Sequence, residues 1–155
     1  MNDEYIGTIE EWVRLANMDL NTATHMFETF RPIPLEVVCF HSQQAAEKML
    51  KCFLVFKGIV PPKTHNLGEL LKMCTKYESG FTEITQEAAL ITDYGVLPRY
   101  PAELELEEHD GKTAIKYANK VRDFVNEFVF SPTTDKGEVE KETPADEISG
   151  NEDLS

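Results

Sequence analysis

The chain lacks the features that mark a membrane-spanning, secreted or disulfide-held protein. It contains no run of about 18 apolar residues, so the sequence predicts no membrane-spanning helix. Its first residues lack the basic stretch and apolar segment of a secretion signal. The three cysteines form no closely spaced pair, which indicates buried thiols rather than a disulfide or metal framework. We therefore expect a cytoplasmic protein.

Basic residues are scarce as well. Lysine and arginine together number 15 against 28 aspartates and glutamates, which gives a net charge of −13. A strongly negative chain disfavours avid binding of duplex DNA, because phosphate backbones need a broad basic surface. A single small basic pocket remains compatible with this balance.

The last part of the sequence combines negative charge with almost no apolar surface. Residues 133–155 hold eight acids, two lysines and no aromatic residue, and they carry nearly half of the excess negative charge. Such a composition cannot offset the entropy of ordering. We predict a folded unit over residues 1–132 and a disordered acidic tail over 133–155, without a second folded domain.

The remaining residues show the apolar periodicity of amphipathic α-helices. Thr8 and Glu11 form a capping-box pattern at the first start, and Gly58 ends the second helix. Asn66 and Asp110 are the predicted caps of two later helices. No segment alternates as a strand would. The predicted helices cover residues 8–30, 35–57, 66–77, 82–95 and 110–131, which makes an all-α, up-and-down helical bundle of four main helices plus one short helix.

The helix predicted over residues 35–57 is apolar on more than one side. Phe40, Leu54 and Val55 lie away from its main apolar stripe, beside polar residues. A helix of this kind is central or lies at a subunit interface. We expect both, with a homodimer formed through these three side chains.

The polar side of the same helix carries the most informative functional pattern. Four polar side chains fall within an arc of about 80° at helical spacing: His41, Gln44, Lys48 and Lys51. An imidazole, an amide and two ammonium groups on one face suit an anion. The alternative is a solvated stripe in which Glu47 pairs with Lys51 in the next turn.

Two loops add to this prediction. His65 directly precedes the predicted cap Asn66, where backbone N–H groups favour anions; alternatively, its ring hydrogen-bonds a loop carbonyl. Arg99 and Tyr100 lie between two prolines, and an arginine fork fits phosphate. Alternatively, Arg99 pairs with a neighbouring acid and fixes the loop.

The sequence predicts no metal site and no cofactor. The four histidines lie on four separate segments, and no pair of ligands has the spacing of a metal site. Glu108, His109 and Asp110 come nearest to such a site. Adjacent residues on a helix point apart, which favours a solvated turn.

Three stretches resemble motifs of the HEPN family, named after higher eukaryotes, prokaryotes and nucleotide binding. FHSQQAAEKMLK resembles the family's helix signature, PPKTHNLGELL its His-ending connector, and DYGVLPRYP its Tyr…Arg-Tyr-Pro segment. The resemblance spans residues 9–130. It implies a four- or five-helix bundle, usually a homodimer, which in bacteria and archaea is often encoded beside a minimal nucleotidyltransferase as a toxin–antitoxin-like pair.

The interpretation that we favour is a binding module. It binds a nucleotide or other phosphorylated ligand, or serves as partner of a nucleotidyltransferase, and has no catalytic residue. The predicted ligand-binding residues are His41, Gln44, Lys48, Lys51, His65, Arg99 and Tyr100.

Two other functions stay open. One is a metal-independent HEPN ribonuclease, although the family's Arg-x4–6-His motif is absent, since nine residues separate Arg31 from His41 and Arg99 from His109. Such an enzyme would pair Arg99 with His109 or His65, the arginine stabilising charge and the histidine moving a proton. The other is a purely structural dimerisation module.

Overall fold

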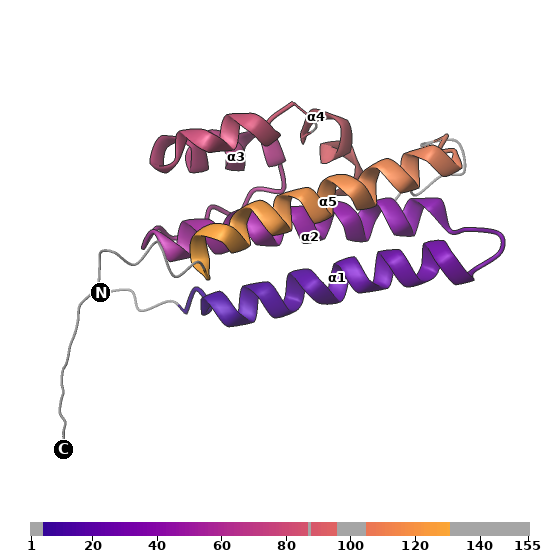
Figure 1. Ribbon diagram of the computed structural model, residues 1–155, viewed down its shortest axis with the longest axis horizontal. Coiled ribbons are helices and arrows are strands. Elements are labelled where there is room, and N and C mark those ends of the chain that lie inside the picture. The colour runs from indigo at the N-terminus through magenta and orange to yellow at the C-terminus, as the bar shows by residue number, and fades with distance from the viewer. Residues whose placement is uncertain (1–4, 87, 96–104, 131–155) are drawn as a thin grey trace, which may run out of the picture.

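The computed structural model describes residues 5–86, 88–95 and 105–130. Over these residues the chain forms α-helices and short 3-10 helices and no strand (Figure 1). The elements are α1 (Ile9–Thr29), α2 (Leu35–Phe56), α3 (Leu67–Tyr77), the 3-10 helix η1 (Ser79–Ile84), α4 (Ala88–Ile91), the 3-10 helix η2 (Thr92–Gly95) and α5 (Glu108–Val129). The all-α prediction is confirmed. The predicted tail lies outside the described residues.

The three long helices lie side by side, and the short helices lie beside α2 and α5, on the side away from α1 (Figure 1). α1 runs antiparallel to α2, to which it is joined by a turn that contains Pro32 and Pro34. α5 runs in the same direction as α2, because the short helices return the chain across the bundle. α1 therefore begins at the end of the bundle where α2 and α5 finish.

α1 begins at its predicted cap. The Glu11 N–H donates to Thr8 Oγ1 at 3.1 Å, and the Thr8 N–H donates to Glu11 Oε1 at 3.0 Å. This reciprocal pair satisfies N–H groups that the first turn leaves open. The buried side chains of α1 are small or aliphatic, namely Ala16, Leu20 and Ala23, so α1 packs closely on its neighbour.

α2 is the central helix, as its sequence predicts. It contacts α1 and α5 and packs under α3. Met49 and Phe53 are fully buried, and so is Leu54. Leu54 therefore cannot form the predicted dimer surface, because its side chain belongs to the core of a single chain. Phe40 and Val55 are partly exposed.

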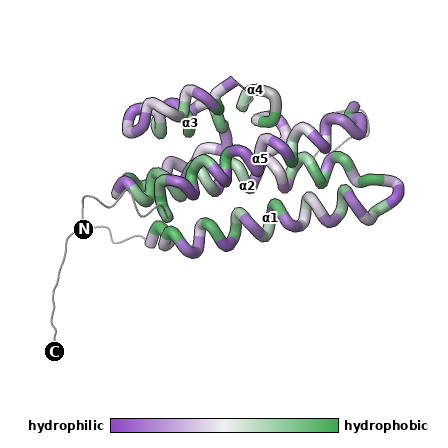
Figure 2. The backbone as a smooth tube through the Cα atoms, viewed as in Figure 1, coloured by the Kyte–Doolittle hydropathy of each residue, from purple (hydrophilic) through white to green (hydrophobic). Residues whose placement is uncertain are grey.

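α1 and α5 each turn one face to the core and one to solvent. Figure 2 shows hydrophilic and hydrophobic stretches alternating along both helices. α5 begins after Glu107, whose N–H donates to Asp110 Oδ2 at 2.8 Å. Asp110 is thus the third residue of the helix and not its cap, which corrects the predicted start. Spacing alone missed this, because a carboxylate serves at either position.

The other helix boundaries follow the sequence. α2 ends before Gly58, whose φ of +78° suits a residue without a Cβ atom. The Glu69 N–H donates to Asn66 Oδ1 at 3.0 Å and caps α3 as predicted. No helix in the described part of the chain is long and apolar enough to cross a bilayer.

The chain between α3 and α5 is not the single helix predicted over residues 82–95. It forms η1, α4 and η2 in succession. The apolar positions Ile84, Ala88 and Ile91 are nevertheless buried. Periodicity therefore predicted the buried side of this segment but not its backbone hydrogen bonds, since a 3-10 turn also brings residues three apart to one side.

An aromatic cluster ties this segment to the long helices. The ring centroid of Phe81, in η1, lies 4.6 Å from that of Phe53 and 4.9 Å from that of Phe124. Phe128, in the last turns of α5, lies 5.7 Å from Phe53. These edge-to-face contacts fix the end of the bundle where α2 and α5 finish.

Candidate functional site

One carboxylate from α1 lies against the polar side of α2. Asp19 Oδ1 is 2.8 Å from His41 Nδ1, and Asp19 Oδ2 accepts a short hydrogen bond from Lys48 Nζ. The side chains of Asp19 and Lys48 are 14% and 24% exposed. We call these three residues the Asp19 cluster. Because the carboxylate compensates the ammonium group within the chain, this half of the face is less positive than the sequence predicts.

A second carboxylate lies further along α2. Glu47 Oε2 accepts a hydrogen bond from Lys51 Nζ at 2.9 Å and lies 3.0 Å from His65 Nδ1. The side chains of Glu47 and Lys51 are 6% and 10% exposed, whereas that of His65 is 69% exposed. We call these residues the Glu47 cluster. The alternative pairing of Glu47 with Lys51 is confirmed, but the pair is buried rather than solvated.

Gln43 fastens the connector between α2 and α3 to the same face. Its Nε2 donates to the His65 carbonyl at 3.0 Å, and its Oε1 accepts from Gln44 Nε2 at 2.8 Å. A Cβ atom on Gly95 would approach the Gln43 amide to 3.0 Å, so η2 also closes over this side chain. Gln43 is fully buried. His65 is therefore held twice, at its carbonyl by Gln43 and at its ring by Glu47, and we call this the His65 clasp.

Both clustered histidines turn the same ring nitrogen to a carboxylate. A carboxylate only accepts hydrogen bonds, so Nδ1 of His41 and of His65 carries the proton. Nε2 is then the nitrogen that each ring presents to a ligand. In His65 this edge lies on a largely exposed ring.

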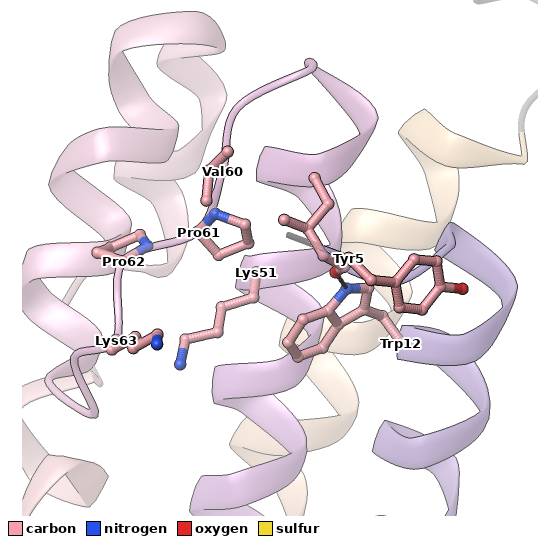
Figure 3. Close-up of a pocket in the computed structure, with 8 residues that line it drawn as sticks. Tyr5, Trp12, Lys51, Val60, Pro61, Pro62 and Lys63 are labelled. Atoms are coloured by element: carbon pink, nitrogen blue, oxygen red, sulfur yellow. Dashed lines mark hydrogen bonds between the residues drawn. The ribbon is translucent and has the colours of Figure 1, made fainter. Parts of the chain in front are cut away.

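A pocket opens at the end of α2 next to the Glu47 cluster (Figure 3). It has a volume of about 190 Å³ and is lined by Tyr5, Ile6, Trp12, Lys51, Val60, Pro61, Pro62 and Lys63. Figure 3 shows the ammonium groups of Lys51 and Lys63 pointing toward one another on one side of this space. We call it the Trp12 pocket. It joins the start of α1, the end of α2 and the connector.

The aromatic walls of the Trp12 pocket are held by bonds that use their polar atoms. Trp12 Nε1 donates to the Ile6 carbonyl at 2.8 Å, and the Tyr5 hydroxyl donates to Glu11. Gly7 has a φ of +90°, and a Cβ atom there would lie 2.8 Å from Trp12 Nε1. Only glycine therefore lets the N-terminal segment lie directly on the indole.

The structure brings the predicted residues together in two groups instead of one open face. His41 and Lys48 meet at Asp19, while Lys51 and His65 meet at Glu47. Gln44 is joined to the second group through its bond to Gln43. Arg99 and Tyr100 lie outside the described residues. The predicted role of all seven residues in ligand binding stays a prediction.

Sequence reasoning missed Asp19 and Gln43 as members of the site. Asp19 follows Ala16 by three residues and precedes Ala23 by four, so it lies beside the buried stripe of α1. Gln43 lies on the apolar side of α2, three residues before Ala46. A polar residue in an apolar stripe needs a partner, and that signal is visible in the sequence.

His109 is exposed at the start of α5. Its ring nitrogens lie 3.5 Å from Glu107 Oε1 and 3.6 Å from Asp110 Oδ1, and its side chain is 71% exposed. This is the solvated turn that the sequence favours. No group of three or more His, Cys, Asp or Glu side chains among the described residues could hold a metal ion.

The three cysteines are buried thiols, as predicted. Cys39, Cys52 and Cys74 are unpaired, and burial raises the pKa of each thiol to about 12. The thiol form persists at neutral pH, and a thiol is a poor nucleophile compared with a thiolate. Their role is therefore in packing.

Comparison with known proteins decides the family. The family model of the HEPN domain matches residues 9–128, which is most of the chain. The chain belongs to the HEPN family. No curated protein matches this HEPN chain at a significant level.

Two solved structures are similar to this HEPN protein. One is ST0689, an archaeal HEPN homologue, with 25% sequence identity, a TM-score of 0.62, and coverage of 79% of this chain and 98% of that one. The other is TT1696 from Thermus thermophilus, with 23% identity, a TM-score of 0.66, and coverage of 77% and 96%. The likeness to TT1696 concerns the fold alone.

The His65 clasp joins two stretches of the chain that resemble HEPN motifs. The helix motif around Glu47 and the connector motif ending at His65 appear in the sequence as two separate HEPN-like signatures. In the structure they are the two sides of one contact. In this chain the two stretches therefore act together to attach the connector to α2.

Proposed function

We propose that this HEPN protein is a binding module for a phosphorylated ligand such as a nucleotide, held on the polar face of α2. The observation that carries the proposal is the position of Lys51. Lys51 is only 8% exposed, and one of its N–H groups donates to Glu47. Lys51 also lines the Trp12 pocket beside Lys63. An ammonium group has three N–H donors, so Lys51 keeps donors fixed in direction for a phosphate, while Glu47 compensates part of its charge.

Other residues of the face complete the proposed site. His65 presents Nε2 on an exposed ring fixed by the His65 clasp, and it donates to phosphate when protonated. Lys48 and His41 continue the face toward Asp19. Arg99 and Tyr100 remain proposed ligand contacts from the sequence.

A ligand panel tests this function. We expect AMP, ATP or GTP to raise the melting temperature, since a ligand at 100 times its Kd stabilises the folded state by about 2.7 kcal/mol. Lys51→Ala should reduce the shift, measured against the melting temperature of the same variant without ligand. The matched control is Lys116→Ala, which removes an exposed lysine from α5. The proposal is wrong if no phosphorylated ligand shifts the wild-type protein.

The described residues give no comparable support for a nuclease. Each arginine in this part of the chain has other partners: Arg14 contacts Met18, Arg31 donates to backbone carbonyls, and Arg122 contacts Asn17 and Asp123. None of these contacts brings a guanidinium group to a histidine. Stabilising a phosphorane while moving a proton needs both groups at one site.

We also propose a homodimer, and a nucleotidyltransferase as a further partner, from the family resemblance. Leu15 and Met18 support an interface, because they are 37% and 54% exposed on α1 although both are apolar. Light scattering of the purified protein should give twice the 17.6 kDa of one chain. Met18→Glu should lower that mass toward the monomer. A monomer mass at high concentration for the unaltered protein would contradict the dimer.

A further inference from the structure

We infer that the Trp12 pocket takes the terminal phosphate monoester of the ligand. This inference rests on the proposed function: it says where the phosphorylated ligand binds and which of its chemical groups the protein recognises. The same group ends a mononucleotide and a 5′-phosphorylated oligonucleotide.

The charge of the pocket selects an anion. Among the residues that the structure describes, its charged lining groups are the ammonium groups of Lys63 and of Lys51, which Glu47 also binds, and both face the same space (Figure 3). The other walls are rings and aliphatic surface, and Trp12 and Tyr5 use their polar atoms elsewhere. The apolar walls reduce the screening by water at the largely buried Lys51, and the exposed Lys63 adds a second positive charge for a dianion.

The size of the pocket selects a small group. Its volume of about 190 Å³ is below the roughly 300 Å³ or more of pockets that enclose drug-sized ligands. A phosphate monoester group fits this space. Its two lysines therefore suit the phosphate end of a ligand.

The parts that form the pocket are held in place before a ligand arrives. Glu47 fixes the Lys51 ammonium at 2.9 Å, and the Lys51 side chain is only 10% exposed. Gly7 lets the N-terminal segment lie on Trp12. A preformed site loses less entropy when its ligand binds.

The chain offers a direct probe, because Trp12 is its only tryptophan. Its fluorescence therefore comes from a side chain in the wall of the pocket. We would titrate the full-length protein with ribose 5-phosphate, with ribose, and with a short oligoribonucleotide carrying or lacking a 5′-phosphate. Ribose 5-phosphate should give a saturable change and ribose none. If the 5′-phosphorylated oligonucleotide binds more tightly than ribose 5-phosphate and the unphosphorylated oligonucleotide does not bind, the ligand is the phosphorylated end of an RNA.

Variants separate the pocket from the rest of the face. Lys63→Met should weaken binding of ribose 5-phosphate about tenfold or more, since it removes a charged donor. Lys63 is exposed, so this variant should fold even if Lys51→Met does not. Gly7→Ala should weaken binding without removing a charge, because the added Cβ displaces Trp12 or the segment over it. Lys116→Met should bind as the wild type does.

Two outcomes overturn the inference in distinguishable ways. If nucleotides raise the melting temperature but no phosphate monoester changes the Trp12 fluorescence, the ligand binds outside the pocket and only this inference fails. If neither signal responds, the proposed function fails with it. If the Lys63→Met variant and the wild type bound ribose 5-phosphate with equal affinity, the inference about the Trp12 pocket would also be wrong.

Discussion

Glu47→Ala is expected to lower the free energy of unfolding by about 3 kcal/mol, which is the cost of breaking a buried ion pair on one side. The substitution leaves the Lys51 ammonium, on a side chain that is 10% exposed, without its carboxylate. It also releases the His65 ring from Glu47. Urea denaturation measures the loss as a lower midpoint at unchanged slope.

Glu127→Ala is the matched control. Glu127 is also a helical glutamate, but it is exposed on α5, so its loss should change stability by less than about 0.5 kcal/mol. In the double variant Glu47→Ala/Lys51→Met no unpaired ammonium remains, so the loss should be smaller than the sum of the two single losses. If Glu47→Ala lowered the free energy of unfolding by less than about 1 kcal/mol, the Glu47 cluster would not stabilise the attachment of the connector to α2.

Phe81→Ala is expected to cost about 3–5 kcal/mol, the range for removing a buried aromatic side chain. Phe81 is fully buried, and its ring contacts Phe53 and Phe124 edge to face at centroid distances of 4.6 and 4.9 Å. Its removal leaves a cavity between η1 and the long helices and forfeits these ring contacts. Thermal and urea unfolding both report the loss.

Two further variants make this result specific. Phe81→Leu keeps most of the volume and should cost less than the alanine variant. Phe130→Ala removes a phenylalanine that is 52% exposed after α5, and it should cost far less still. If Phe81→Ala and Phe130→Ala were equally stable, η1 would contribute nothing to the core.

The long helices were predictable because local signals and burial agree in them. α1 carries a capping box and a stripe of spacing four and three, and the structure places it at Ile9–Thr29. Gly58 supplies the stop of α2 through its positive φ. In the segment between α3 and α5 the two signals disagree. Ser79 and Gly80 favour a turn while the apolar spacing favours a helix, and tertiary contacts of Phe81 decide the result.

The site was predictable only in part, because its contacts join distant segments. Spacing on one helix placed Lys48 and Lys51 on the polar side of α2, and it gave the local pairing of Glu47 with Lys51. It could not show that Asp19 reaches Lys48, since that contact spans 29 positions of sequence and depends on how α1 packs. The same holds for the Trp12 pocket, whose walls come from three segments.

The His65 clasp has a consequence for engineering this fold. Glu47 and His65 stand 18 positions apart but form one contact, so the effect of a substitution at either depends on the residue at the other. In a chimera with α2 from another HEPN protein and the connector of this chain, His65 would face a different residue at position 47. To keep the Glu47–His65 contact, residues 35–66 have to be exchanged together, and Asp19 of α1 has to match the new His41 and Lys48 positions as well.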